Sequence, residues 1–169
     1  MGNGTDEGRT PVPGSETLAS IEARLAALED REAIRRLIAS YGPLADLGDA
    51  QAAAALWTED GTYDIGTHGA HRGHRGIAAL LESDEHRQLI AGGAAHILSA
   101  PLIDLDGDRA TARTYSCVLR KNGNVWVAHR VAANHWQLAR TQAGWRVTGR
   151  VNRLLDGSAE ARALIGNRI

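Results

Sequence analysis

Asp46 and His96 are the two side chains of this sequence best suited to proton transfer. Asp46 interrupts the apolar run Leu44–Leu47, and a carboxylate drawn inward with such neighbours is costly unless it has a partner. His96 opens a strand-like segment, and imidazole is the usual general base at neutral pH. An aspartate bonded to one ring nitrogen fixes the tautomer and stabilises the imidazolium. We therefore predict that the two meet in one cavity, the alternatives being a solvated helix-terminal aspartate and a structural histidine.

Tyr41 and Arg150 are the candidate partners of this pair. Tyr41 either donates a hydrogen bond to a carbonyl oxygen or fills the core with its hydroxyl at the edge. Strand alternation places Arg150 opposite Val147 and Val151, on an exposed face suited to a salt bridge. Gly149 beside it is typical of a bulge or a close approach, which leaves the facing open. Further candidates for substrate binding are Tyr63, Trp57, Asn134 and His129. The alternative is that these side chains fill the core or lie on the sheet surface.

Three histidines, His68, His71 and His74, recur at a spacing of three. This spacing aligns metal ligands on a helix, which the glycine-rich segment 66–76 is not expected to form, and the run holds no carboxylate or thiolate. We therefore predict an exposed loop near the cavity mouth and no metal site. Cys117, the only cysteine, is expected to pack as a small apolar residue.

The composition limits the class of protein. The 169 residues suffice for one domain with a sizeable core, and a formal net charge of -1 gives no field that would recruit nucleic acid or an anionic membrane. A single cysteine provides no disulfide framework and fits a reducing cytoplasm. Residues 1–14 are expected to form a disordered tail before one domain over 15–169. No stretch approaches the roughly 20 apolar residues that cross a bilayer.

The pattern of apolar residues predicts the elements that position these side chains. Helical spacing is found over 15–47, 49–57 and 77–90. After a turn at 59–61 and a short strand over 62–65, strand-like runs cover 96–105, 109–121, 125–140 and 145–155. Short Asp/Asn/Gly connections between these later runs favour hairpins. The sequence therefore predicts an α+β fold, in which N-terminal helices close a curved, mainly antiparallel, cone-shaped sheet around a pocket.

Several short motifs occur in an order that is typical of a known family: Leu28–Ile34, Tyr41 with Asp46, Gly48–Asp49, Leu56–Gly61, His96, Asp106–Ala110 and Gly144–Val147. With these motifs, residues 21–156 resemble the SnoaL-like branch of the nuclear transport factor 2-like α+β cone proteins. This family includes lyases, isomerases, cyclases, hydrolases and non-enzymes, so the resemblance is more specific for the fold than for the reaction.

Within that family, the dehydratases of scytalone and of bile acids and a dehydrochlorinase of chlorinated cyclohexanes use an aspartate with a histidine. The resemblance implies that Asp46 and His96 match this pair and that Tyr41 matches a tyrosine of the bile-acid enzyme. It also implies that Arg150 matches an arginine and points inward, against the alternation count. A homodimer paired through the outer sheet face is a further implication of the resemblance.

We accordingly expect a cofactor-independent lyase of the dehydratase type, acting on a small hydrophobic cyclic substrate of polyketide or steroid character. His96, oriented by Asp46, would remove a proton from carbon near a carbonyl, while Tyr41 or Arg150 stabilises the enolate. Two alternatives stay open. One is a cyclase or isomerase that uses the same pair, and the other is a non-catalytic ligand-binding module in which the pair is only a buried polar contact.

Overall fold

The computed structural model describes residues 17–66 and 69–166. The expected tail over 1–14 and the predicted helix start at Ser15 lie outside these residues. None of the helices in the described ranges is long and apolar enough to cross a membrane. In chain order the elements are α1 (Leu18–Leu47), α2 (Ala50–Ala54), β1 (Trp57–Asp64), β2 (Ala70–Arg72), α3 (Gly73–Leu81), α4 (Asp84–Ala91), β3 (Ala94–Leu98), β4 (Leu102–Asp106), β5 (Arg109–Asn122), β6 (Val125–Thr141), β7 (Gly144–Leu154) and α5 (Ala159–Gly166).

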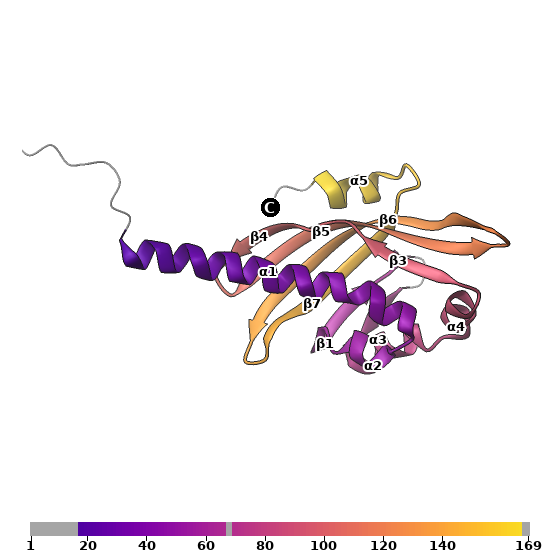
Figure 1. The fold of residues 1–169 in the computed structure, drawn as a ribbon, viewed down its shortest axis with the longest axis horizontal. Helices are drawn as coiled ribbons and strands as arrows, with labels where there is room; N and C mark the ends of the chain where they lie inside the picture. The colour runs from indigo at the N-terminus through magenta and orange to yellow at the C-terminus, as the bar shows by residue number, and fades with distance from the viewer. Residues whose placement is uncertain (1–16, 67–68, 167–169) are drawn as a thin grey trace, which may run out of the picture.

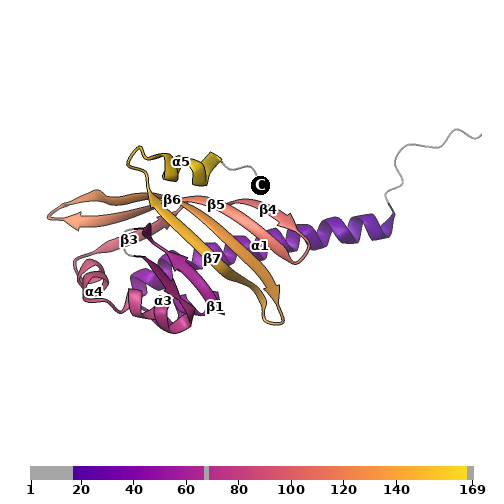
Figure 2. The same cartoon turned by 180° about the vertical axis from the view of Figure 1, so that it is seen from behind.

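A curved, open sheet forms the frame of the molecule (Figures 1 and 2). Its strands lie in the order β2-β1-β7-β6-β5-β3, with β4 also paired to β5. Every pairing in the described chain is antiparallel except that of β1 with β7. Tight connections at 106–108, 122–124 and 142–144 join β4 to β5, β5 to β6 and β6 to β7, which are the predicted hairpins. The predicted α+β class with a mainly antiparallel sheet is confirmed.

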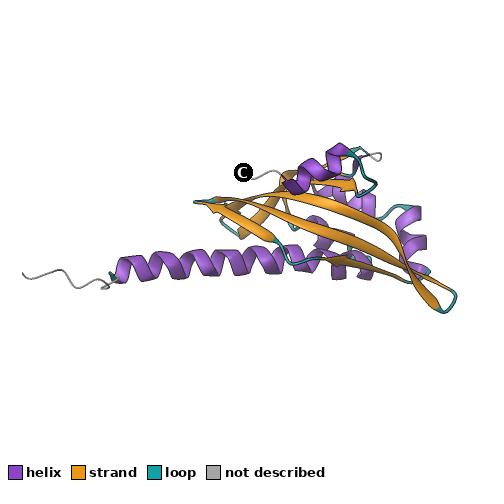
Figure 3. Cartoon of the chain, turned by 90° about the horizontal axis from the view of Figure 1, so that it is seen from above, coloured by secondary structure: helices purple, strands orange, loops and turns teal. Residues whose placement is uncertain are grey.

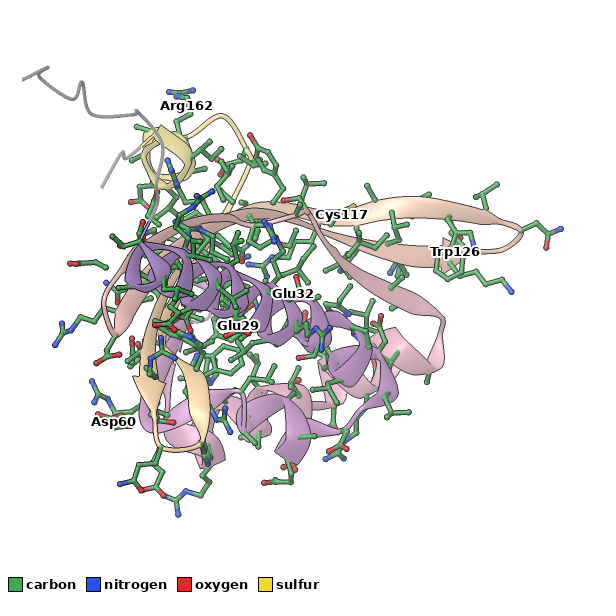
Figure 4. The ribbon with its side chains drawn as sticks, turned by 60° about the vertical axis from the view of Figure 1, so that its left-hand side comes forward. Glu29, Glu32, Asp60, Cys117, Trp126 and Arg162 are labelled. Atoms are coloured by element: carbon green, nitrogen blue, oxygen red, sulfur yellow. The ribbon has the colours of Figure 1, made fainter. Side chains whose placement is uncertain are left out.

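Helices α1 to α4 lie on one face of the sheet and α5 on the other (Figures 1 and 2). The 30-residue helix α1 begins after Thr17, whose side chain accepts a hydrogen bond from the Ser20 backbone N–H, and it ends at Gly48, where φ is 74°. Beyond the sheet body, the β5–β6 hairpin extends outward, with Trp126 near its tip (Figure 4). The α1 side chains that pack into the core are Ile34, Ile38, Tyr41 and Ala45.

Two β-bulges change which residues face the core. The register between β6 and β7 shifts at Thr148, and the register between β5 and β6 shifts at His129. Because an extra residue reverses the alternation, Val147 and Arg150 are both buried, at 0% and 2% exposure. The exposed position that simple alternation gives Arg150 is therefore wrong, and its side chain is directed inward.

Two predictions for the segment before β3 are wrong. The described part of the predicted loop over 66–76 contains β2 and the first turn of α3, because β2 pairs with β1 and α3 buries its apolar face. The single helix predicted over 77–90 is divided at Ser83, whose hydroxyl accepts a hydrogen bond from the His86 N–H and caps α4.

Two further boundaries differ from prediction. The helix predicted through Trp57 ends at Ala54, and Trp57 already belongs to β1, which runs through the predicted turn with a register shift before Thr62. The run 96–105 is divided into β3 and β4, which lie one after the other along the same edge of β5. An interruption around Pro101 separates them, since proline lacks the N–H that a ladder needs.

Candidate active site

Asp46 lies in the last turn of α1, and its carboxylate faces His96 on β3. Oδ1 is 2.6 Å from His96 Nδ1, and the His96 backbone N–H donates to Oδ2 at 2.9 Å and to Oδ1 at 3.2 Å. The side chains are 28% exposed for Asp46 and 14% for His96. Because a carboxylate only accepts hydrogen bonds, Nδ1 carries the ring proton and Nε2 is the nitrogen able to take a proton from a ligand.

Close packing of α1 on β3 makes this contact possible. A Cβ at Gly42 would lie 2.1 Å from the carbonyl oxygen of His96, so only glycine lets the helix approach the strand this closely. One turn later the helix presents Asp46 to the same residue. Gly42 therefore sets the distance across which the carboxylate and the imidazole interact.

A cavity of about 140 Å³ lies beside His96. An engineered apolar cavity of roughly 150 Å³ holds benzene, so this space matches one six-membered ring. Glu85 and His129 are exposed lining residues and mark the mouth. The cavity is lined by Tyr41, Tyr63, Ile65, Leu80, Leu81, Ser83, Glu85, His86, Leu89, His96, Leu98, Ser116, Cys117, Val118, His129, Arg130, Arg150 and Asn152.

Arg150 brings a buried positive charge to the cavity wall. Its Nε and Nη2 donate to Asn134 Oδ1 at 3.0 and 2.8 Å, and its guanidinium carbon lies 4.1 to 4.5 Å from three aromatic ring centroids. Nη1 is buried with no hydrogen-bond partner, and no carboxylate in the described ranges forms an ion pair with this guanidinium. The rings around it belong to Tyr41, Tyr63 and Trp136.

Tyr41 is suited to donate a hydrogen bond rather than to act as a base. Its side chain is 4% exposed and lines the cavity. Burial, with the neighbouring Tyr63 as a smaller cause, raises the pKa of the Tyr41 hydroxyl far above its usual value, although Arg150 opposes the shift. The phenol therefore keeps its proton across the physiological pH range.

His86 is a cavity residue that sequence reasoning missed. Its ring centroid lies 5.5 Å from that of His96, and Nδ1 is 2.9 Å from the Leu81 carbonyl oxygen. Burial, and then the charge of His96, lower the pKa of His86. In the neutral ring Nδ1 donates to Leu81, which leaves Nε2 as an acceptor that is buried without a partner. Its place one helical turn before Leu89 was the available signal.

The other predicted site residues are divided between the cavity and the core. Tyr63 and His129 line the cavity, whereas Trp57 and Asn134 do not. Trp57 stacks on Tyr63 with ring centroids 5.6 Å apart, and its Nε1 donates to the Thr62 carbonyl. Asn134, 1% exposed, holds Arg150 in place instead of facing a ligand.

The histidine-rich segment has structural contacts. His74 Nε2 lies 2.9 Å from the carbonyl oxygen of Trp57, and His71 is half-buried on β2. His68 is outside the described residues. Across residues 17–66 and 69–166, no three His, Cys, Asp or Glu side chains are grouped as a metal site would require. Cys117 is a free, half-buried cysteine on the cavity wall.

The sequence from residue 26 to 151 matches the SnoaL-like domain. This chain belongs to the SnoaL-like domain family. The SnoaL-like domain is also 50% identical to an NTF2-like protein with a cystatin-like fold from Novosphingobium aromaticivorans, with a TM-score of 0.89 and coverage of 91% of this chain and 100% of the other. The resemblance seen in the sequence is thus confirmed at the level of family and fold.

More distant structures share the fold of this SnoaL-like domain. ActVI-ORFA from Streptomyces coelicolor is 23% identical, with a TM-score of 0.64 and coverage of 74% of this chain and 96% of that one. A protein of unknown function from Mycobacterium tuberculosis is 21% identical, with a TM-score of 0.68 and coverage of 86% and 88%. The comparison with curated proteins gave no significant match.

Proposed function

We propose that this SnoaL-like domain is a lyase of the dehydratase type that needs no cofactor and acts on a cyclic hydroxy-carbonyl compound. SnoaL-like domains bind small hydrophobic ligands, which agrees with a ring-sized cavity of about 140 Å³. The observation that carries the proposal is the 2.6 Å contact between Asp46 Oδ1 and His96 Nδ1 on the wall of that cavity. This contact leaves His96 Nε2 as a base oriented by a carboxylate.

The reaction needs only proton transfers by His96. Nε2 takes the proton from the carbon next to the substrate carbonyl, and the C–H electron pair forms an enolate. The enolate then expels hydroxide from the neighbouring β-carbon, and the imidazolium returns its proton to the departing oxygen, so that water and a conjugated carbonyl compound are formed. A positioned base of this kind contributes roughly 10²–10⁴-fold to the rate.

Polar groups in the cavity lining suit both the carbonyl and the hydroxyl of such a substrate. Arg150 Nη1 and the protonated Tyr41 hydroxyl are donors for the carbonyl oxygen, on which negative charge develops in the enolate. His86 Nε2 is an unpartnered acceptor for a substrate hydroxyl. The presence of both donors and an acceptor in the cavity lining favours a hydroxy-carbonyl compound over a plain hydrocarbon, and the cavity volume favours a single reacting ring.

The test uses a panel of cyclic β-hydroxy ketones incubated with the protein in D₂O. Wild type is expected to exchange the α-proton and to release a product lighter by one water, both observed by NMR and mass spectrometry. His96→Ala should lose both signals, whereas His135→Gln, at a half-buried histidine away from the cavity, should keep them. Full turnover by His96→Ala would refute the proposal.

Product mass separates this reaction from the alternatives. A cyclase or isomerase built on the same Asp46–His96 pair would convert its substrate with no change in mass. A non-catalytic binding module would bind ring compounds without exchange or turnover, and His96→Ala would then alter affinity alone. Pairing of subunits through the outer sheet face remains part of the proposal that rests on the family resemblance.

A further inference from the structure

The N-terminal half of α1 extends past the sheet (Figures 1 and 3). It carries a row of exposed apolar side chains. Leu18 is 77% exposed, Ile21 47%, Leu25 54% and Leu28 64%. Large apolar side chains at this exposure on one projecting element mark an interaction surface. These four residues form the α1 seam.

The α1 seam has the spacing of a coiled coil. Intervals of three, four and three residues separate Leu18, Ile21, Leu25 and Leu28, which are alternating a and d positions of two heptads. Leu25 and Ile34, the first core residue of α1, are nine residues or two and a half turns apart, so they lie on opposite sides of the helix. A second helix can therefore bind the seam without displacing the sheet.

The seam ends where the helix joins the body. Glu32 occupies the next a position and forms ion pairs with Arg35 at 3.8 Å and with Arg36 at 3.0 Å. Figure 4 shows Glu29 and Glu32 on successive turns of α1. Since a charged, paired residue replaces the apolar one at this point, the pattern is confined to the projecting half.

Charges beside the seam identify the partner and its direction. The e positions are Glu22 and Glu29, and the g position between the two turns of the seam is Arg24. In a parallel pair of identical helices, g of one heptad faces e of the next heptad on the partner, which places Arg24 opposite Glu29. An antiparallel pair would place e against e and g against g, so that like charges meet. Arg24 and Glu29 therefore form complementary pairs only in the parallel arrangement.

We propose that the α1 seam binds the α1 seam of a second copy of this chain as a short parallel coiled coil. Two heptads form a small interface, so association in the micromolar range is expected and the mass depends on protein concentration. This surface differs from the outer sheet face, where Tyr115 and Val131 are 49% and 42% exposed.

Analytical ultracentrifugation of the full chain tests the proposal. Wild type is expected to reach at least twice the mass of the 18.0 kDa chain. The Ile21→Glu/Leu25→Glu variant should halve that mass, with a dissociation constant raised roughly 10²-fold or more. The control Ala23→Glu/Ala26→Glu adds the same charge at exposed positions off the seam and should associate like wild type.

Disulfide crosslinking tests whether the two α1 helices are parallel or antiparallel. In a Cys117→Ser background, Leu18→Cys should crosslink to itself in a parallel pair, whereas Ala23→Cys should not. In an antiparallel pair residue 18 lies near residue 28 of the partner, about 15 Å along the axis from its own equivalent, which is too far for a disulfide. A monomeric wild type, a mass unchanged by the seam variant, or crosslinking only between Leu18→Cys and Leu28→Cys chains would overturn the proposal.

Discussion

Replacing Asp46 by Asn tests the Asp46–His96 pair with the smallest possible change in shape. The carboxylate accepts from both the His96 backbone N–H and Nδ1–H. An amide has one acceptor and one donor, so it satisfies both contacts only if its oxygen faces the backbone N–H and its NH₂ faces an unprotonated Nδ1. The ring proton then moves to Nε2, and His96 no longer presents a base to the cavity.

The size of the effect follows from these contacts. Loss of the oriented base should lower the rate of α-proton exchange by about 10²–10⁴-fold. Hydrogen bonds to a charged group contribute about 1.5–3 kcal/mol and neutral ones about 0.5–1.5 kcal/mol. Because the Asp46 side chain is 28% exposed and every contact keeps a partner, the free energy of unfolding should fall by only about 1–2 kcal/mol. Asp46→Asn should therefore fold normally and lose activity.

Long-range ¹⁵N–¹H spectroscopy of the His96 ring measures the tautomer without any substrate. Wild type should show the proton on Nδ1 and Asp46→Asn the proton on Nε2. The control is Asp49→Asn, three residues away at the exposed cap of α2, where Asp and Asn cap equally well. A wild-type ring protonated on Nε2, or an unchanged tautomer together with unchanged exchange in Asp46→Asn, would contradict this role of Asp46.

Three further predictions concern the surroundings of the pair. Arg150→Met should lower the exchange rate by about 10²–10³-fold while the melting temperature stays equal or rises, because it removes a buried charge that lacks an ionic partner; a clear loss of stability by calorimetry would contradict this. Gly42→Ala should cost about 1–3 kcal/mol in urea unfolding, because its Cβ would lie 2.1 Å from the His96 carbonyl oxygen, and a neutral result would show that α1 can move away from β3. The pKa of His86 is lowered in the folded state, so the unfolded chain binds more protons and the free energy of unfolding should decline as pH falls below about 6.5. His86→Gln should make this slope shallower, and His135, whose pKa is also lowered by burial, should contribute to the slope that remains; an unchanged slope would exclude the assignment.

Local signals in the sequence were sufficient for much of the fold. The Asp/Asn/Gly connections at 106–108 and 122–124 predicted hairpins correctly, because turn chemistry acts within a few residues. Residues 70–72 were wrongly predicted as loop because β2 is held by backbone hydrogen bonds to β1 and has no apolar pattern of its own. Pro43 also lies inside α1, where tertiary packing keeps the helix continuous to Leu47.

The candidate site was partly accessible from residue types. Asp46 and His96 stood out because a carboxylate among apolar residues requires a partner, and the structure places them in contact. Strand alternation gave the wrong facing for Arg150 because the extra residue of the bulge at Thr148 reverses which side chains face the core. His86 was missed because only the folded chain brings α4 beside β3.

The cage of aromatic rings around Arg150 has a practical consequence. With no anion beside it among the described residues, the guanidinium relies on π faces and on a single amide oxygen, while one of its nitrogens has no acceptor. Any small molecule that carries a negative oxygen to that nitrogen supplies a missing interaction and should raise the unfolding temperature by mass action. Ring-sized acids and enols can therefore be screened by differential scanning fluorimetry, in which a raised unfolding temperature identifies compounds that bind beside Arg150.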